Sequence, residues 1–399
     1  MIRRLLVANV SALLLVAPGL AQVSPESAEK YTAGQELFQK RRYAEAIKTF
    51  EESTTLDGQN AQAYQAMGLT YQKMRNYEKA AEAYKMATSV KPDYTGAYFA
   101  LGQLQLVSLK KYGDAQSSFR KVLDLDPGFK DGKAQEFLAG AHLRQGLIYI
   151  RQKNYKSAVE EYTTASQIDP ANAKTFYNLG LAHKGARNYK EAIESVSTAT
   201  DLNPDYDKAY KALGDLYKLT RKNSRAALAY EKAIKANPKN ARAYISLADV
   251  YSDTKQLAKA VSTLKKGIAQ NANNAKMLTA LGFAQHQSKD YSGAIASYKK
   301  AIAQDARSKE AQYRISVTYF ETKQYKSASA AARKALSGRY SIPANVILGD
   351  ILEAVKSEGW KDQAIAHYTK GLRDRRYKKY CEDKIERIKN PMGDEEETD

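Results

Sequence analysis

Apolar side chains recur at helical spacing along most of the chain, in pairs of segments separated by short polar turns. Residues 207–240 are the clearest copy. Their apolar positions are Tyr210, Leu213, Leu216 and Tyr217 in the first segment, and Ala226, Ala227, Tyr230, Ala233 and Ile234 in the second. Steps of three and four residues are typical of amphipathic helices. Residues 220–223 form the polar turn, and Pro238 follows the second helix. Each copy is therefore predicted to be a helix-turn-helix hairpin.

The hairpin pattern repeats about every 34 residues. A small residue recurs in the first helix and an alanine in the second. The small residues are Gly34, Gly68, Gly102, Gly146, Gly180, Gly214, Ala248, Gly282, Ser316 and Gly349, and the alanines are Ala46, Ala80, Ala115, Ala158, Ala192, Ala226, Ala260, Ala294, Ala328 and Ala364. A period of this length indicates a stacked array, in which each unit buries its apolar surface against its neighbours.

The unit resembles the tetratricopeptide repeat (TPR). The residues that carry the resemblance are Tyr210, Leu213, Gly214, Tyr217, Ala226, Tyr230, Ala233 and Pro238. The resemblance implies an all-α, right-handed superhelical solenoid of about ten helix-turn-helix repeats with a C-terminal capping helix. The small residues are expected to let the two helix backbones of a hairpin approach each other.

The period also predicts how the chain is divided. The expected repeats are 27–60, 61–94, 95–129, 139–172, 173–206, 207–240, 241–274, 275–308, 309–341 and 342–376. One extra residue is assigned to the turn at 110–113, and residues 130–138 are predicted as a helical insertion that lengthens the next first helix. Residues 377–393 are predicted as a polar-backed capping helix, and 394–399 as a solvated acidic tail.

Residues 1–21 have the pattern of a secretory signal peptide. Arg3 and Arg4 precede a short apolar run, and Gly19-Leu20-Ala21 is a small-x-small cleavage site. The exported protein is then expected to begin near Gln22, in the periplasm or secreted, without an integral membrane segment. The alternative is an uncleaved N-terminal anchor.

The chain is strongly basic, with 63 Lys and Arg against 44 Asp and Glu, a net charge of +19. Residues 173–308 alone hold 23 basic and 11 acidic side chains. Such a charge attracts acidic proteins, anionic polymers or lipid surfaces. Because the chain is expected to be exported, nucleic acid is not expected as the partner. The alternative is a lysine-rich solvated exterior without a specific partner.

Motifs of catalysis, cofactor binding or metal binding are not found in the sequence. The four histidines are scattered singly, and no glycine-rich phosphate loop or G-x-S-x-G is present. His142 and His183 fall in the slots for large residues, and Glu160-Glu161 is expected to be solvated. Cys381 is expected to be a small buried residue of the capping helix, or else to form an intermolecular disulfide. The chain is therefore not expected to be an enzyme.

The concave wall, which first helices line in this family, is the expected binding surface. Its candidate groove residues are Phe99, Leu143, Leu147, Lys174, Tyr177, Asn178, Leu181, Lys208, Lys211, Asp215, Arg242, Phe283, Tyr313 and Phe320. Aromatic residues there would bury partner side chains, and the lysines would form a positive stripe. A clamp for a C-terminal carboxylate is not expected, because Asp215 would repel the carboxylate and Ala280 stands where a second basic residue is needed.

The resulting expectation is an exported scaffold that binds a protein or peptide, including an acidic one, in cell-envelope assembly or complex organisation. The alternative is a cationic solenoid that binds an anionic envelope polymer or lipid surface. Generic repeats do not name the partner, because partner choice depends on the groove side chains.

Overall fold

The computed structural model describes residues 23–390, which form helices joined by short turns, with no strand in this part of the chain. The predicted all-α fold of stacked helical hairpins is therefore confirmed. The predicted signal peptide and acidic tail lie outside the described residues. No helix between residues 23 and 390 is both long enough and apolar enough to cross a membrane.

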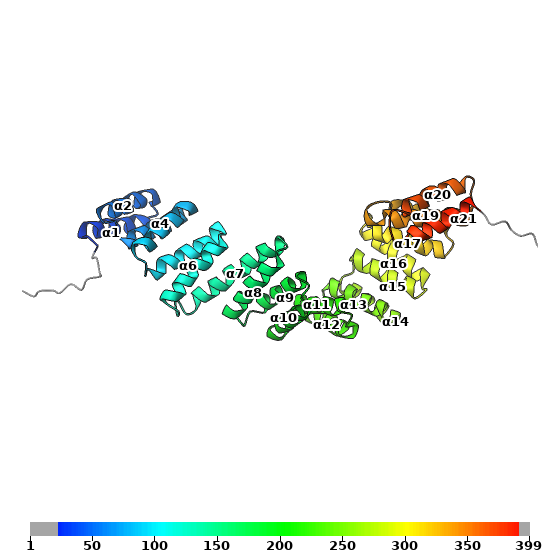
Figure 1. The fold of residues 1–399 in the computed structure, drawn as a ribbon, viewed down its shortest axis with the longest axis horizontal. Coiled ribbons are helices and arrows are strands. Elements are labelled where there is room, and N and C mark those ends of the chain that lie inside the picture. Colours follow the sequence, from blue (N-terminus) through cyan, green and yellow to red (C-terminus); the bar gives the residue numbers. More distant parts are fainter. Residues whose placement is uncertain (1–22, 391–399) are drawn as a thin grey trace, which may run out of the picture. The chain divides into compact units, whose positions relative to one another are not determined.

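The contacts divide the chain into two units, one up to Thr175 and one from Phe176. The first unit contains four hairpins (Figure 1). Their helices are α1 (Pro25–Gln39), α2 (Tyr43–Leu56), α3 (Ala61–Lys73), α4 (Tyr77–Val90), α5 (Thr95–Leu104) with the π-helical turn η1 (Gln105–Leu109), α6 (Tyr112–Leu125), α7 (Lys133–Arg151) and α8 (Tyr155–Ile168).

The second unit begins inside α9 (Ala173–Gly185) and ends with a single helix that follows the last hairpin. Its other helices are α10 (Tyr189–Leu202), α11 (Asp207–Leu219), α12 (Asn223–Ala236), α13 (Ala241–Asp253), α14 (Leu257–Gln270), α15 (Ala275–Gln287), α16 (Tyr291–Gln304), α17 (Lys309–Glu321), α18 (Tyr325–Lys334), the 3₁₀ turn η2 (Gly338–Tyr340), α19 (Ser341–Val355), α20 (Trp360–Gly371) and α21 (Lys378–Lys389).

In seven hairpins the glycine of the first helix faces one aromatic residue of its own second helix. A Cβ added to Gly214 would lie 2.5 Å from the ring of Tyr230, and one on Gly68 would lie 2.6 Å from Tyr84. The same pairing joins Gly34 to Phe50, Gly102 to Phe119, Gly146 to Tyr162, Gly282 to Tyr298 and Gly349 to Tyr368. In these seven hairpins an aromatic ring occupies the space that the missing Cβ leaves, and the expected close approach of the two helix backbones stays a prediction.

The insertion before the fourth hairpin is only partly helical. Lys130, Asp131 and Gly132 all have positive φ, so they form a left-handed turn outside α7. The remaining insertion residues, 133–138, belong to α7, which has 19 residues. The extra residue assigned to the turn at 110–113 is instead accommodated by η1, since a π turn absorbs one residue within a helix.

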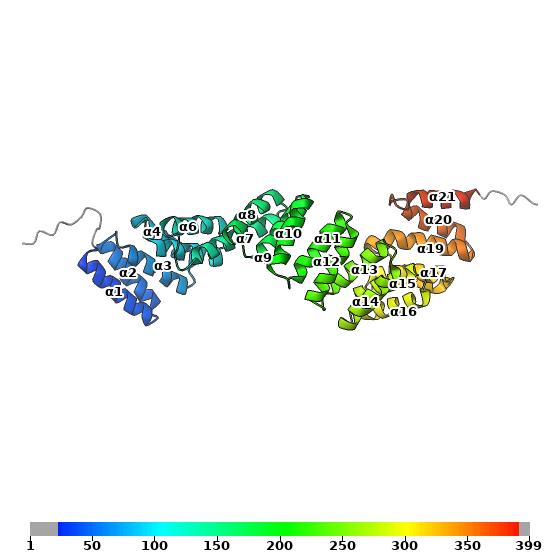
Figure 2. The same ribbon diagram turned by 90° about the horizontal axis from the view of Figure 1, so that it is seen from below.

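Helix α21 packs on α20 at the end of the second unit (Figure 2). Cys381 and Ile388 are buried in a cluster with Val346 and Tyr368. Because the Cys381 side chain is fully buried, the structure supports the expectation of a small core residue. Burial also raises the pKa of its thiol to about 11.

Candidate partner-binding groove

The first helices α13, α15 and α17 of the second unit line a cavity of about 600 Å³, together with the segment 337–340. These helices are neighbours, with α13 beside α15 and α15 beside α17. The lining residues are Ile245, Asp249, Ala275, Lys276, Thr279, Ala280, Phe283, Asp305, Ser308, Lys309, Glu310, Arg314, Ser337, Gly338, Arg339 and Tyr340. This cavity is called the α13–α17 groove below.

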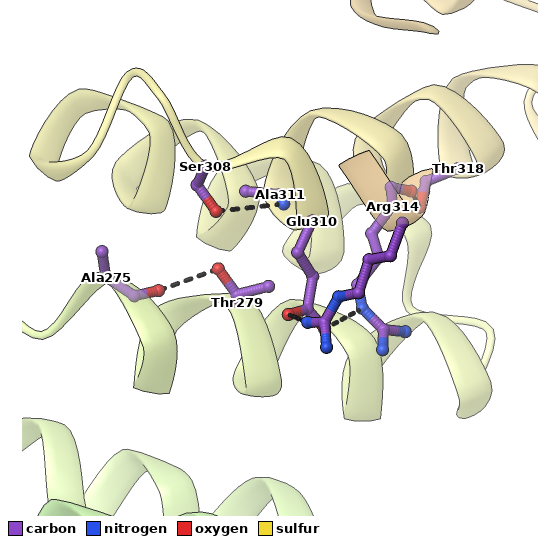
Figure 3. A network of polar contacts seen from close by, with 8 residues as sticks. Ala275, Thr279, Ser308, Glu310, Ala311, Arg314 and Thr318 are labelled. Atoms are coloured by element: carbon purple, nitrogen blue, oxygen red, sulfur yellow. Dashed lines mark hydrogen bonds and ion pairs between the residues drawn. The ribbon is translucent and has the colours of Figure 1, made fainter. Parts of the chain in front are cut away.

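Arg314 is held in the groove by two contacts. Its guanidinium lies over the ring of Phe283, 4.0 Å from the ring centre, and its Nε donates to Oε1 of Glu310 at 2.9 Å. Figure 3 shows the side chains of Arg314 and Glu310, both from α17, with Thr279 of α15 nearby. Among the described residues, the two terminal amino groups of Arg314 make no hydrogen bond that meets the usual geometry. A planar guanidinium fixed in this way can still offer two parallel donors to a carboxylate.

The segment 337–340 closes the far side of the groove. Arg339 donates to Oε2 of Glu310 at 3.1 Å, and its guanidinium lies 4.9 Å from the ring centre of Tyr340. Tyr340 in turn lies against Tyr313 of α17, with 5.6 Å between ring centres. Glu310 is therefore shared by two guanidinium groups, one from α17 and one from this segment.

The groove has a small excess of positive charge. Lys276, Lys309, Arg314 and Arg339 line it together with three carboxylates, those of Asp249, Asp305 and Glu310. Glu310 already pairs with both arginines, and Lys309 donates to the backbone oxygen of Lys334 at 2.9 Å. The donors left for a partner are thus the two terminal amino groups of Arg314 and the ammonium group of Lys276.

Of the predicted groove residues, Phe283 lines the α13–α17 groove, and Tyr313 lies beside it through Tyr340. Phe320 does not line the groove, because its ring packs against Tyr325 of α18 at 5.8 Å. Arg242 is exposed near the start of α13 and is also absent from the groove lining.

The predicted positive stripe on α11 is partly neutralised. Lys211 donates to Asp215 at 2.6 Å, and the other oxygen of Asp215 accepts the hydroxyl of Tyr230 at 2.8 Å. Lys208 is exposed, whereas Lys211 is half-buried and paired with Asp215, so of these two lysines only Lys208 fits the predicted positive stripe. On α9, Lys174 is exposed, Tyr177 packs against Tyr206, and Asn178 and Leu181 are half-buried.

In the first unit, Phe99 is not available to a partner. Its ring is 5% exposed and lies 5.0 Å from that of Phe129 and 5.5 Å from that of Phe137. Phe137 lies in the part of α7 that comes from the insertion and has no counterpart in the other repeats. Phe129 is the last residue of its repeat, and it covers Phe99 as Tyr206 covers Tyr177. Leu143 is half-buried, and Leu147 is 45% exposed.

The expectation for the Glu160-Glu161 pair is wrong for its second member. Oε2 of Glu161 lies 2.7 Å from Nδ1 of His142 and accepts from Gln116 at 2.9 Å. His142 is 3% exposed, so it lies in the core of the first unit. No group of three or more potential metal ligands occurs among residues 23–390.

Sequence reasoning missed Arg314, Glu310 and Arg339. A signal for Arg314 was present, since it stands 34 residues after Ala280, in the slot where a second basic residue was sought. Glu310 and Arg339 carried no such signal, because their role depends on the segment 337–340 folding back onto α17.

Tetratricopeptide repeat models match most of the array. The matched residues are 30–60, 61–94, 95–129, 173–206, 221–282 and 285–337, and a further model described as TPR repeat matches 146–185.

Curated relatives match over less than half of the chain. Human protein O-mannosyl-transferase TMTC3 is 23% identical over 164 residues, which are 38% of this chain and 17% of that protein. The DnaJ homolog subfamily C member 7 homolog of Dictyostelium discoideum is 24% identical, over 39% of this chain and 30% of its own length. The SPINDLY probable N-acetylglucosaminyltransferase of Hordeum vulgare is 25% identical, over 41% and 17%. The chain thus spans less than a third of each of these relatives.

Solved structures are similar at low sequence identity. Yeast Tom70 is 15% identical with a TM-score of 0.43, covering 91% of this chain and 95% of its own. A tetratricopeptide repeat protein from Parabacteroides merdae is 16% identical with a TM-score of 0.49, covering 63% and 99%. Because the repeat models together match more than half of the residues, the chain belongs to the tetratricopeptide repeat proteins.

Proposed function

We propose that this chain is a protein-binding scaffold whose α13–α17 groove holds an extended partner segment with an acidic side chain. The observation that carries the proposal is Arg314, whose terminal amino groups remain open to the groove while Phe283 and Glu310 fix its plane. A partner carboxylate can pair with such a guanidinium through two hydrogen bonds, without ordering a flexible side chain first. The proposed role is binding and not catalysis.

Different groove residues would contact the charged and the apolar side chains of the partner segment. Arg314 and Lys276 supply the positive charge, while Ile245, Ala280 and Phe283 supply apolar contact area. Asp249 and Glu310 would repel a segment with several consecutive carboxylates. The groove therefore favours a segment in which one acidic residue is flanked by apolar ones.

A peptide selection tests this proposal. Phage-displayed random peptides are selected on the wild-type chain and measured on R314Q, with R333Q as the control, because Arg333 is exposed on α18 and absent from the groove lining. Selected peptides are expected to contain Asp or Glu, and to bind R314Q about 10- to 100-fold more weakly, the size expected for a hydrogen-bonded charge pair. Peptides that bind wild type and R314Q equally would contradict the proposal.

We further propose that the scaffold is exported and acts in the periplasm, in the assembly or organisation of envelope complexes. The support is the pattern of residues 1–21, a basic start, a short apolar run and a small-x-small site. N-terminal sequencing of the mature protein is expected to begin at Gln22. Detection of Met1 on the protein in its final compartment would contradict cleavage.

A further inference from the structure

Every hairpin has a lysine or arginine in a left-handed backbone conformation at the turn between its two helices. The ten residues are Arg41, Arg75, Lys110, Lys153, Arg187, Arg221, Lys255, Lys289, Lys323 and Lys356, with φ between 52° and 65°. All ten side chains are exposed. None lies within ion-pair distance of a carboxylate of the described residues.

The backbone of these turns does not require a cation. In the turn after α11, the N–H of Lys222 donates to the carbonyl of Tyr217 at 2.8 Å, and Gln256 makes the equivalent bond to Tyr251 at 2.7 Å. This pattern places Arg221 and Lys255 at the helix-ending position that most often holds glycine or asparagine. A side chain with a Cβ is strained there. A cation at the C-terminal end of a helix interacts favourably with the helix dipole, but asparagine or glycine would adopt this backbone conformation with less strain.

Within the second unit the cations share one edge. The first helices α11, α13, α15, α17 and α19 are neighbours in chain order and run in the same direction, so the turns that follow them lie at the same side of the stack. The six within-hairpin turns of this unit, 186–188, 220–222, 254–256, 288–290, 322–324 and 356–359, hold seven basic and two acidic side chains. This row is called the cationic edge below.

The opposite edge of the second unit carries no such excess. The turns that connect one hairpin to the next, at 203–206, 237–240, 271–274, 305–308 and 335–340, hold three basic and two acidic side chains. The first unit, taken by itself, shows the same feature, with seven basic and no acidic side chains in the turns 40–42, 74–76, 110–111 and 152–154. The excess charge of the chain is thus concentrated at one kind of turn.

We propose that the cationic edge of the second unit binds a linear anionic polysaccharide, independently of the α13–α17 groove. A row with at least one unpaired cation per repeat is matched by a polymer with anions along its length, because each pairing releases counterions.

Two observations favour a polysaccharide over a bilayer or a nucleic acid. The residues that flank the cations are mostly Thr, Ser, Asn and Gln, so the edge offers few apolar side chains to insert among lipids. Tyr217 and Tyr251 lie just before the turns, but Arg225 and Lys259 stand over their rings at 6.0 and 5.6 Å, so these faces are covered and not open for stacking with bases.

The test removes three turn cations without disturbing the backbone. In the full chain, Arg221, Lys255 and Lys289 are replaced together by glycine, which adopts positive φ without strain. The control replaces Lys235, Lys265 and Lys299 by glutamine, because these exposed lysines lie on the second helices α12, α14 and α16, and their loss changes the net charge by the same amount. Circular dichroism checks that both variants are as helical as wild type.

The probe is fluorescently labelled heparin, measured by anisotropy at about 50 to 200 mM salt, the range over which counterion release changes affinity strongly. The glycine variant is expected to bind roughly tenfold more weakly than wild type and with a shallower salt dependence, whereas the control variant and R314Q stay within about twofold of wild type. Equal weakening of both triple variants would overturn the proposal, since net charge would then suffice. Absent heparin binding, or tighter binding of phosphatidylglycerol vesicles or single-stranded DNA than of heparin, would overturn it as well.

Discussion

At the scale of single residues, each hairpin depends on complementary volumes in its two helices. Where the first helix has glycine, the facing position holds an aromatic ring in seven hairpins, and in the fifth hairpin Gly180 faces Val196. Where the first helix has Ala248 or Ser316, the equivalent positions of the second helix hold the smaller Leu264 and Ala332. Outside the fifth hairpin, a smaller residue in the first helix therefore accompanies a larger residue in the second helix, as close packing requires.

Gly214→Ala tests this complementarity. The added Cβ would lie 2.5 Å from the Tyr230 ring, so the variant is expected to lose about 1 to 3 kcal/mol of unfolding free energy by overpacking. The control is Gly140→Ala in α7, where nothing lies within 4 Å of the new Cβ. It is expected to gain about 0.5 to 1 kcal/mol, since alanine is the better helix former. Urea denaturation measures both, and a destabilised control or an unchanged Gly214→Ala would contradict the packing account.

The small and large positions were predictable from sequence because the 34-residue period averages over ten copies. The surroundings of individual groove residues were not. Phe99 was expected in the open groove, but Phe137 covers it from an insertion that occurs once in the chain. Lys211 was expected in the positive stripe, but Asp215, one helical turn away, pairs with it. Periodicity predicts contacts that recur from repeat to repeat, and these two contacts do not recur.

The burial of Cys381 leads to a separate prediction about the reactivity of its thiol. Burial raises the pKa of its thiol from 9.0 to about 11, so the folded protein keeps the thiol protonated and covered at pH 8. A thiol-reactive disulfide reagent is expected to modify the folded chain slowly and the urea-unfolded chain fast, since the thiolate is the reactive form. Fast modification of the folded chain would contradict the burial.

The raised pKa of the Cys381 thiol also makes the stability of the folded chain decrease at high pH. The folded state holds the thiol proton more tightly than the unfolded state, so this contribution to stability is fully present below pH 9 and is lost as the pH rises towards 11.

At the scale of elements, α21 is held on the last hairpin by polar contacts as well as apolar ones. Tyr380 donates to Asp350 at 2.6 Å, Lys384 donates to Glu353 at 2.7 Å, and the hydroxyl of Tyr368 lies within hydrogen-bond distance of both carboxylates. Burial raises the pKa of Asp350, although the two tyrosine hydroxyls oppose this. The sequence predicted the apolar stripe of this helix, but not the paired carboxylates of α19, which periodicity does not distinguish from solvated charges.

Lys384→Met tests the polar part of this contact. The variant keeps much of the side-chain length but leaves Glu353 without its cation, and the loss of one partner of a partly buried pair is destabilising. We expect faster amide hydrogen exchange in α21 and α20, with α1 to α8 unchanged, because terminal repeats open locally. Lys389→Met, an exposed change at the end of the same helix, is the control. Unchanged exchange in α21 would show that the apolar contacts alone hold the helix.

At the scale of the whole molecule, two surfaces with different chemistry are proposed on the second unit. The α13–α17 groove combines a fixed guanidinium with apolar area, so its binding is expected to depend mainly on the dissociation rate. The cationic edge presents unpaired charges, so its binding is expected to weaken strongly as the salt concentration rises. Separate variants can remove one surface while the other stays intact.

Site-specific photo-crosslinking in the native cell tests the central claim, binding of a protein partner in the α13–α17 groove, most directly. A photoreactive phenylalanine analogue replaces Ala280, which lines the groove, or Lys300, which is exposed on α16. The account predicts that Ala280 crosslinks to a defined partner segment containing an acidic residue, that the crosslink is lost in R314Q, and that Lys300 gives none. The same crosslinked proteins at both positions, or an undiminished Ala280 crosslink in R314Q, would contradict it.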